Sequence, residues 1–161
     1  EPDMDVSTIV VILFLVVGVI FLMVFVIKSV MSPKKVESIN RLTKQGKITQ
    51  AIKLAKTLIQ KDPQDFLAHY YLGKAYLKDG KSELALMELK YVDQHAVFDE
   101  NLSELDFRQE IAPLYLKFNQ PDEALKQFLL LTKLNPRDSE NYFNAAKLYD
   151  SKGKYEQALG F

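Results

Sequence analysis

The chain has 161 residues, with 21 basic and 21 acidic side chains and no cysteine. The absence of cysteine excludes a disulfide framework, a thiolate metal site and a cysteine nucleophile. The length allows one ordinary domain or a short array of repeats. The neutral total conceals an asymmetry, because residues 1–5 carry three acids and no base, whereas residues 28–61 carry nine bases and one acid.

Residues 6–27 form an uncharged apolar segment whose only polar side chains are Ser7 and Thr8. As a helix this segment would be about 33 Å long, enough to cross a hydrocarbon core of about 30 Å. A cleaved signal peptide would instead have a basic start and a shorter apolar run. We therefore expect a retained transmembrane helix at 6–27, after an acidic tail at 1–5 and before a juxtamembrane segment at 28–31.

The charges that flank this segment predict its orientation. Bases follow the segment and none precedes it, and positive residues favour the cytoplasmic side. We expect a single-pass protein of the cytoplasmic (inner) membrane, with the N-terminus outside and the remainder in the cytoplasm. A periplasmic location of the remainder stays open as the alternative. Contact of Lys28, Lys34 and Lys35 with anionic lipid headgroups is also open.

Four segments of similar sequence recur after the apolar segment. They are KQGKITQAI (44–52), KDGKSELAL (78–86), KFNQPDEAL (117–125) and SKGKYEQAL (151–159). Their spacings of 34, 39 and 34 residues are typical of a repeat architecture. In each, a glycine or asparagine is followed five residues later by an alanine.

Elementary helix chemistry explains one such unit. Gly80 is expected to end a first helix, where a left-handed residue is needed, and Asn119 tolerates the same conformation. Pro121 suits the first position of a second helix. Small residues at Gly73 and Ala85 would allow the two helices to pack closely.

The stretch HYYLGKAYLKDGKSELAL (69–86) resembles the tetratricopeptide repeat, and the resemblance covers residues 32–161. It implies an all-α fold, a right-handed solenoid of helix pairs whose first helices line a concave groove. We expect four units, of which the first is atypical and cap-like, the last is incomplete, and a five-residue insertion precedes the third. Their ranges are 32–65, 66–99, 105–138 and 139–161, with the insertion at 100–104.

Two features depart from the regular pattern. Pro113 lies inside a predicted helix and is expected to kink it and widen the groove. The acidic pairs Asp99/Glu100 and Glu104/Asp106 near the insertion are interpreted as a solvent-exposed junction. Because the sequence stops at Phe161, within the second helix of the fourth unit, we expect the native chain to continue.

The sequence offers little for catalysis or metal binding. His69 and His95 are the only histidines and have no partner at ligand spacing, so a structural role is expected for His69. Phosphate-loop, nucleophile and zinc motifs are also missing from the sequence. We therefore expect no enzyme activity, no cofactor, no metal and no nucleic acid partner.

The family pattern implies that the groove is the binding site. Its apolar and lysine side chains suit a peptide or helix of acidic character, although several of them could equally serve ordinary packing between repeats. Asp106 and Glu110 argue against a clamp for a terminal carboxylate. The expected groove residues are Asn40, Tyr70, Lys74, Leu77, Lys78, Gln109, Leu116, Lys117, Phe143 and Lys147.

The sequence therefore predicts a membrane-anchored scaffold or adaptor that binds a partner protein or peptide. Its layout resembles membrane-anchored tetratricopeptide repeat proteins of bacteria. One alternative is a structural component of a large envelope assembly, such as a flagellar motor collar, in which repeats stack on neighbouring subunits as a homo- or hetero-oligomer. Another is an enzyme or regulator whose active domain lies beyond Phe161.

Overall fold

The computed structural model describes residues 5–151 and Gly153, and for residues 28–34 it describes the backbone alone. The described residues form seven α-helices and no strand. The seven are α1 (Val6–Lys44), α2 (Ile48–Lys61), α3 (Phe66–Lys78), α4 (Ser82–His95), α5 (Glu104–Lys117), α6 (Pro121–Leu134) and α7 (Ser139–Ser151). The second helix expected in the unit 139–161 lies outside the described residues.

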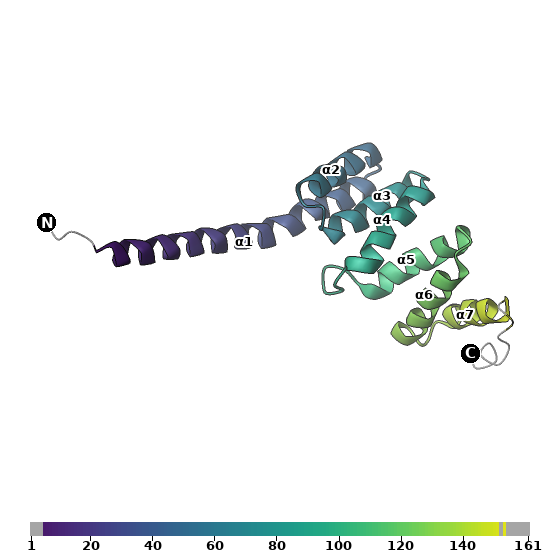
Figure 1. The fold of residues 1–161 in the computed structure, drawn as a ribbon. Coiled ribbons are helices and arrows are strands. Elements are labelled where there is room, and N and C mark those ends of the chain that lie inside the picture. Colours follow the sequence, from purple (N-terminus) through teal and green to yellow (C-terminus); the bar gives the residue numbers. More distant parts are fainter. Residues whose placement is uncertain (1–4, 152, 154–161) are drawn as a thin grey trace.

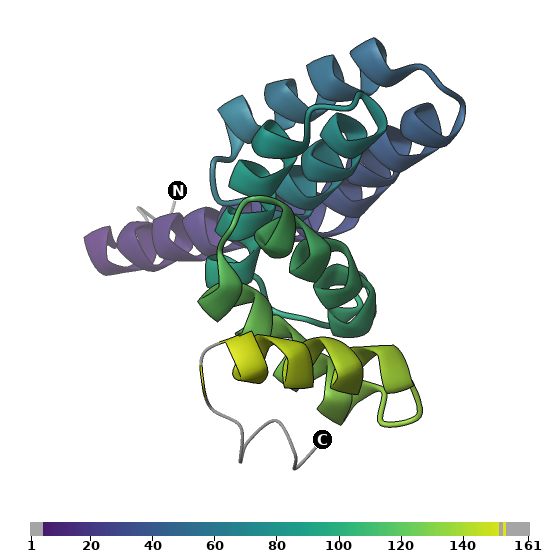
Figure 2. The same cartoon turned by 90° about the vertical axis from the view of Figure 1, so that its right-hand side faces the viewer.

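The helices after the apolar segment stack in chain order. Figure 2 shows this stack, with α2 at one end and α7 at the other. In Figure 1, α1 and the other first helices of each pair, α3, α5 and α7, all run from left to right, and Figure 2 shows that α7 is turned strongly relative to α1. The result is an all-helical solenoid of antiparallel helix pairs.

The left-handed residues predicted at the turns are confirmed. Gly46, Gly80 and Asn119 have φ values of 76°, 74° and 53°. At each turn the amide of the following residue donates to a carbonyl five residues back, as in the bond of 2.9 Å from Lys81 N to Tyr76 O. This is the Schellman arrangement that caps helix C-termini. The recurrent glycine or asparagine therefore marks the reversal inside each helix pair.

Gly73 is the close-contact residue of the second pair, as predicted. A Cβ atom built on it would lie 3.0 Å from Cγ and Cδ2 of Leu89 and 3.5 Å from the Ala85 carbonyl oxygen. Ala85 and Leu89 are fully buried. A side chain at residue 73 would therefore crowd Leu89, and its absence favours the close packing of α3 and α4.

Replacing Gly73 with alanine is expected to destabilise the fold by about 1 kcal/mol. Overpacking against Leu89 costs about 1–3 kcal/mol and outweighs the gain of roughly 1 kcal/mol in helix propensity. Urea unfolding followed by circular dichroism measures this difference. A more stable Gly73→Ala variant would contradict the tight contact.

The boundary predicted at 28–31 is not a break in the structure. α1 stays helical from Val6 through Lys44, across Ser32 and Pro33, so the apolar segment and the first repeat helix form one continuous helix. A proline removes only one backbone hydrogen bond, and helix propagation on both sides compensates for this loss. Residues 6–27 are long and apolar enough to cross a membrane, and their side chains are exposed.

The core extends along the stack and consists of two adjoining clusters of buried residues. The first joins α1–α4 through Ile39, Ala51, Ala55, Leu72, Ala75, Tyr76 and Ala85. The second extends from Tyr70 of α3 to Leu148 of α7. Each helix pair thus buries its apolar side against the next pair, as in other repeat proteins.

The acidic residues near the insertion are mostly exposed, as expected, but the insertion also turns inward. Asp99 and Leu102 pair through their backbones at 3.2 and 3.3 Å, which closes a tight turn. Leu102 is 1% exposed and belongs to the second core cluster. Glu104 begins α5 and binds Arg108, whereas Asp99, Glu100 and Asp106 are exposed. The insertion therefore anchors α5 through a buried leucine.

The first helices are unequally spaced. The α1 and α3 backbones approach within 8 Å, whereas those of α3 and α5, and of α5 and α7, do not. Pro113 does lie inside α5, on its exposed side. The face that the first helices share is therefore more open on both sides of α5, and not only at the insertion.

Candidate functional site

One face of the stack is built by the first helices alone, and we call it the groove face. On each first helix, residues three and four apart line up in one stripe along the helix axis. The stripes contain Glu37, Asn40 and Lys44 on α1; Leu67, Tyr71, Lys74 and Lys78 on α3; Asp106, Gln109, Pro113 and Lys117 on α5; and Glu140, Asn144 and Lys147 on α7.

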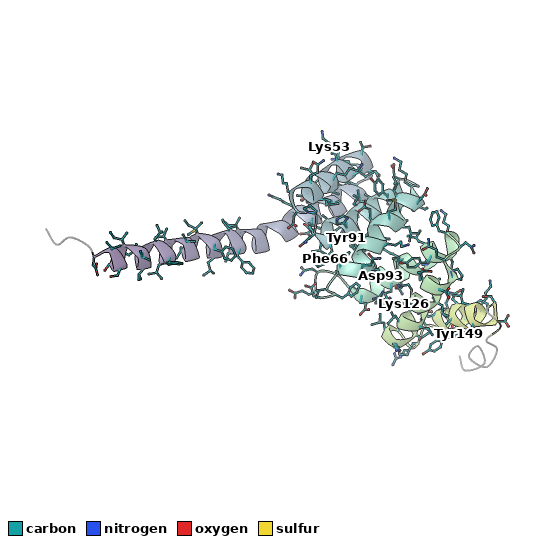
Figure 3. All side chains as sticks on the ribbon, viewed as in Figure 1. Lys53, Phe66, Tyr91, Asp93, Lys126 and Tyr149 are labelled. Atoms are coloured by element: carbon teal, nitrogen blue, oxygen red, sulfur yellow. The ribbon has the colours of Figure 1, made fainter. Side chains whose placement is uncertain are left out.

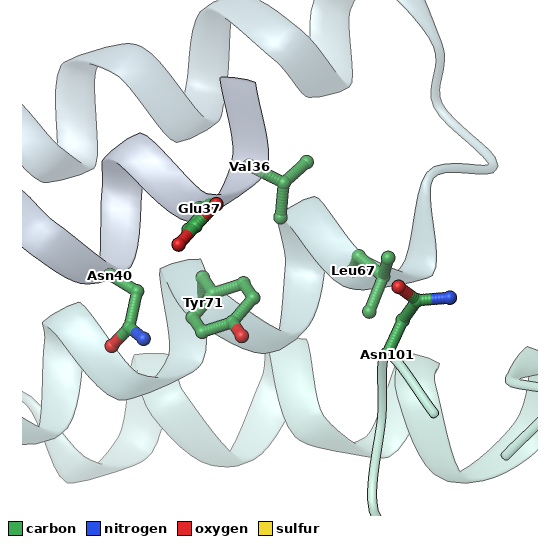
Figure 4. A pocket seen from close by; sticks show the side chains of 6 residues that line it. All are labelled: Val36, Glu37, Asn40, Leu67, Tyr71 and Asn101. Atoms are coloured by element: carbon green, nitrogen blue, oxygen red, sulfur yellow. The ribbon is translucent and has the colours of Figure 1, made fainter. Parts of the chain in front are cut away.

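A first hollow of about 240 Å³ lies in the groove face between α1 and α3. Glu37 and Asn40 of α1 face Tyr71 of α3 across it, and Asn101 of the insertion closes one end beside Leu67 (Figure 4). Burial raises the pKa of the Tyr71 hydroxyl above its usual value of about 10, so this group is protonated and can donate or accept a hydrogen bond. The hollow therefore combines a carboxylate, two carboxamides and a hydroxyl with apolar walls.

A second hollow, of about 380 Å³, lies between α5 and α7. Its floor is apolar, and polar side chains of α5, α7 and the preceding turn surround it. They are Gln109, Asp138, Glu140, Asn141 and Asn144, above a floor of Ala112, Pro113, Leu116, Phe128 and Leu131. Both hollows thus offer oxygen-rich rims over apolar surface.

An ion pair crosses the groove face between α3 and α5. Lys74 Nζ lies 2.7 Å from Glu110 Oε1 and donates to the Tyr70 hydroxyl at 3.3 Å. Burial alone would lower the pKa of Lys74, but the hydrogen bond and charge of Glu110 outweigh burial and raise it. Burial also raises the pKa of Tyr70 to about 12. The centre of the groove face is therefore occupied by a neutral pair.

A buried polar network holds α4, α5 and α6 together beneath this face. Arg108 Nη1 lies 2.7 Å from Asp93 Oδ1 and 2.6 Å from Gln127 Oε1, and its Nε donates to Glu104 at 2.9 Å. Gln127 in turn donates to Asp93 at 3.0 Å. Because the partners of the guanidinium come from three helices, the network fixes the third helix pair against the second.

Comparisons with known proteins decide the kind of repeat. A family model for the TPR repeat matches residues 40–80, and a tetratricopeptide repeat model matches residues 110–161. The chain contains tetratricopeptide repeats. The two matched segments leave out residues 81–109, which include α4 and the insertion.

Solved structures of tetratricopeptide proteins share the fold. A point mutant of MamA aligns with a TM-score of 0.62 at 20% identity, covering 78% of this chain and 70% of its own. Another MamA crystal structure has a TM-score of 0.56 at 21% identity, covering 99% and 91%. Naa15/Naa10 bound to HypK-THB has a TM-score of 0.58 at 20% identity, covering 73% and 17%. No curated protein matches the sequence of the chain.

Most of the predicted groove residues lie on or beside the groove face of this tetratricopeptide array. Asn40 lines the first hollow, and Gln109 and Leu116 line the second. Lys78 and Lys147 are exposed. Phe143 is 66% exposed and lines a shallow apolar depression with Ser139, Tyr142 and Ala146.

Four predicted residues behave differently. Tyr70 is only 5% exposed and packs in the second core cluster, so it is a core residue and not a groove wall. Leu77 is half-buried against both clusters. Lys74 is paired with Glu110, and Lys117 donates to Ser82 at 2.7 Å. The groove face is therefore less cationic than the sequence suggested.

The prediction missed several residues that line the hollows, above all Glu37, Tyr71, Glu140 and Asn144. Helical spacing could have indicated them, because Glu37 lies three residues before the predicted Asn40, and Asn144 lies three residues before the predicted Lys147. Asn101 had no such signal, because its place depends on the turn that Asp99 and Leu102 close.

His69 joins the first two helix pairs. Its Nδ1 lies 2.6 Å from Glu88 Oε2, and its Nε2 lies 3.2 Å from the Pro63 carbonyl oxygen. Because the Glu88 carboxylate and the Pro63 carbonyl both accept, this geometry favours the protonated ring, in which both nitrogens donate. Burial alone would lower the pKa of His69, but Glu88, Pro63 and Asp65 outweigh burial and raise it above the usual 6.5. This geometry agrees with a structural role.

The free energy of unfolding is expected to fall as the pH rises above about 6.5, because of His69. Its folded-state pKa is raised, so its contribution is complete below the unfolded pKa of about 6.5 and is lost as the pH rises through the folded value. Urea unfolding at several pH values measures this slope. The His69→Gln variant should show a flatter dependence of the unfolding free energy on pH than the parent chain, whereas the His95→Gln variant should keep the slope of the parent. An unchanged slope in the His69→Gln variant would contradict this role of His69.

Proposed function

We propose that this tetratricopeptide protein is a membrane-anchored interaction scaffold that binds a partner protein segment on its groove face. The observation that carries this proposal is the pair of hollows on that face, together with the exposed side chains of Leu116 and Phe143. Exposed apolar side chains beside concave polar rims are typical of interaction surfaces. A similar structure, Naa15/Naa10, is bound to HypK-THB, which supports protein binding by such a stack.

The proposed role is not enzymatic. Among the described residues, no group of three or more histidine, cysteine or carboxylate side chains could hold a metal ion. Lys74 and Tyr70 lie together and both have shifted pKa values, but the two side chains are hydrogen-bonded to each other, and Lys74 is paired with Glu110.

The anchor in this proposal is the apolar half of α1, residues 6–27. Its length matches a hydrocarbon core, and its side chains have no neighbouring helix among the described residues to cover them. The bases that follow it favour a cytoplasmic location of the repeats at the inner membrane, with the N-terminus outside. Retention of the full chain in membranes after an alkaline wash tests the anchor.

A second candidate is a structural part of a larger assembly, in which α7 stacks on a neighbouring subunit. The specific observation is Phe143, whose exposed ring lines an apolar depression on α7 with Ser139, Tyr142 and Ala146. An exposed apolar depression on a repeat helix suits packing against a repeat of another subunit.

Site-specific photo-cross-linking in intact membranes distinguishes these roles. A photoreactive residue at Gln109 is expected to cross-link a partner protein, because Gln109 lines the second hollow. The control is Lys126 on α6, an exposed position away from the groove face and labelled in Figure 3. Partner cross-links from Lys126 alone would contradict binding on the groove face. Cross-links between copies of the chain from Phe143 would favour the assembly.

A further inference from the structure

The charges on the groove face are sorted by sign across its width. Each stripe ends in a lysine, and three of the four carry a carboxylate near their start. We call Glu37, Asp106 and Glu140 the acidic rim, and Lys44, Lys78, Lys117 and Lys147 the basic rim. All seven side chains belong to exposed residues.

The shared sense in which the first helices cross the groove face creates this sorting. Asp106 and Glu140 lie in the first turns of α5 and α7, and Lys44, Lys78 and Lys117 lie in the last turns of α1, α3 and α5, where each complements the helix dipole. Glu37 and Lys147 lie outside these terminal turns, and their place in the rims follows from their position along the stripes. On a single isolated helix, the acid and the lysine would affect only the two ends of that helix. In Figure 1 the four first helices all run from left to right, so charges near their starts and charges near their ends gather towards opposite edges of the groove face.

The middle of the groove face contributes little net charge. Lys74 and Glu110 neutralise each other at 2.7 Å. The remaining surface between the rims includes Pro113, Leu116 and the carboxamides of Asn40, Gln109 and Asn144. A ligand therefore meets apolar and neutral groups at its centre and opposite charges at its two sides.

The separation of the rims fits an α-helix. Glu37 and Lys44, and likewise Glu140 and Lys147, are seven residues apart, or about 10 Å along the helix axis. Asp106 and Lys117 are about 16 Å apart by the same measure. An α-helix with its side chains is about 10–12 Å wide. A helix lying across the first helices would thus place its flanks beside the two rims.

We propose that the partner segment is an amphipathic helix with a basic flank and an acidic flank on either side of its apolar stripe. Its basic flank lies over the acidic rim, where both hollows have their carboxylates, and its acidic flank lies along the basic rim. Turning the helix end for end would place like charges together, so the rims also fix its direction along the stack. This proposal rests on the proposed function and specifies the partner, which we had expected from the sequence to be acidic.

Two synthetic helical peptides of identical composition test the proposal with the detergent-solubilised full chain. Both carry a leucine stripe; one has lysines on one flank and glutamates on the other, and the second mixes the two on both flanks. The charge-split peptide is expected to bind about tenfold more tightly at low salt, since several exposed pairs each contribute modestly. The difference should shrink as added salt screens the charges. Equal affinities, or weak binding of both peptides, would overturn the proposal.

Variants of the chain complete the test. Glu37→Lys with Glu140→Lys should abolish the preference for the charge-split peptide. The matched control, Lys53→Glu with Lys126→Glu, changes exposed residues on α2 and α6 and should retain it (Figure 3). Circular dichroism checks that each variant is folded. Loss of preference in the control alone would overturn the proposal.

The direction of the peptide provides a further readout. A photoreactive group at its N-terminus should label one end of the stack in the parent chain. It should label the other end when both rims are fully reversed, by Glu37→Lys, Asp106→Lys and Glu140→Lys together with Lys44→Glu, Lys78→Glu, Lys117→Glu and Lys147→Glu. An unchanged labelling end would contradict the role of the rims. Partner cross-linking at Gln109 tests the proposed function separately, so either idea can fail alone.

Discussion

Replacing Asp93 with alanine is expected to lower the free energy of unfolding by about 3–5 kcal/mol. Asp93 accepts hydrogen bonds from Arg108 and Gln127, and its Oδ2 lies 3.4 Å from the Tyr115 hydroxyl. Its removal leaves the buried guanidinium of Arg108 without its nearest charge partner on α4. The negative charge of Asp93 also raises the pKa of Tyr115, although burial is the larger cause.

Urea unfolding measures this loss, with Gln94→Ala as the control. Gln94 is the exposed neighbour of Asp93 on α4, so its replacement is expected to change stability by less than about 0.5 kcal/mol. Combining Asp93→Ala with Arg108→Met should cost less than the sum of the single changes, because no buried charge is then left unpaired. Strict additivity would show that the two residues do not act as a pair.

Replacing Phe107 with alanine is expected to cost a similar amount, about 3–5 kcal/mol. The ring is fully buried and lies between Tyr70 of α3 and Phe98, at centroid distances of 6.2 and 5.4 Å. Its removal would open a cavity where α5 meets the preceding pair. The α3 and α5 backbones do not approach within 8 Å, so contact between these two first helices depends on side chains such as Tyr70 and Phe107.

Phe143→Ala is the matched control for Phe107→Ala. It removes the same side chain from a site that is 66% exposed, and is expected to change stability by less than about 0.5 kcal/mol. Hydrogen exchange adds a local test, since Phe107→Ala should reduce protection in α5–α7 more than in α1–α2. Equal losses for the two variants would mean that the junction is not held by Phe107.

The repeat fold was predictable because its signals are local. Gly80 and Asn119 end their helices through the conformations that the turns require, and Gly73 is recognisable because a helix interior tolerates glycine poorly. Each of these requirements acts within a few residues, so the sequence displays it directly. The tetratricopeptide repeats and the helix pairing were therefore correctly predicted.

The site was only partly predictable, because its character depends on partners distant in sequence. Lys74 was expected to be free, but Glu110 neutralises it from the next helix pair. Tyr70 was expected to line the groove, but the packing of Phe107 places it in the core. Arg108 gave no signal in isolation, since its partners come from α4 and α6 as well as from its own helix.

The junctions were also difficult to predict. The juxtamembrane segment predicted at 28–31 implied a boundary between the apolar segment and the first unit, yet α1 continues through it and through Pro33, because a single proline does not outweigh the helical preference on both sides. Leu102 within an acidic stretch gave little indication that the insertion turns inward, because burial depends on the turn that Asp99 closes. Sequence patterns describe elements well and their mutual contacts poorly.

Because α1 is continuous, it fixes the direction in which the groove face points around the axis of the apolar half of α1. Residues on one helix are fixed in angular phase, at about 100° per residue. One residue inserted between Ile27 and Lys35 would therefore rotate Glu37, Asn40 and Lys44 by about 100° around the axis of the apolar half. Seven inserted residues would restore the original orientation of the groove face to within about 20° and would move it about 10 Å further from the apolar half. Whatever holds the apolar half of α1 thus orients the rest of the molecule.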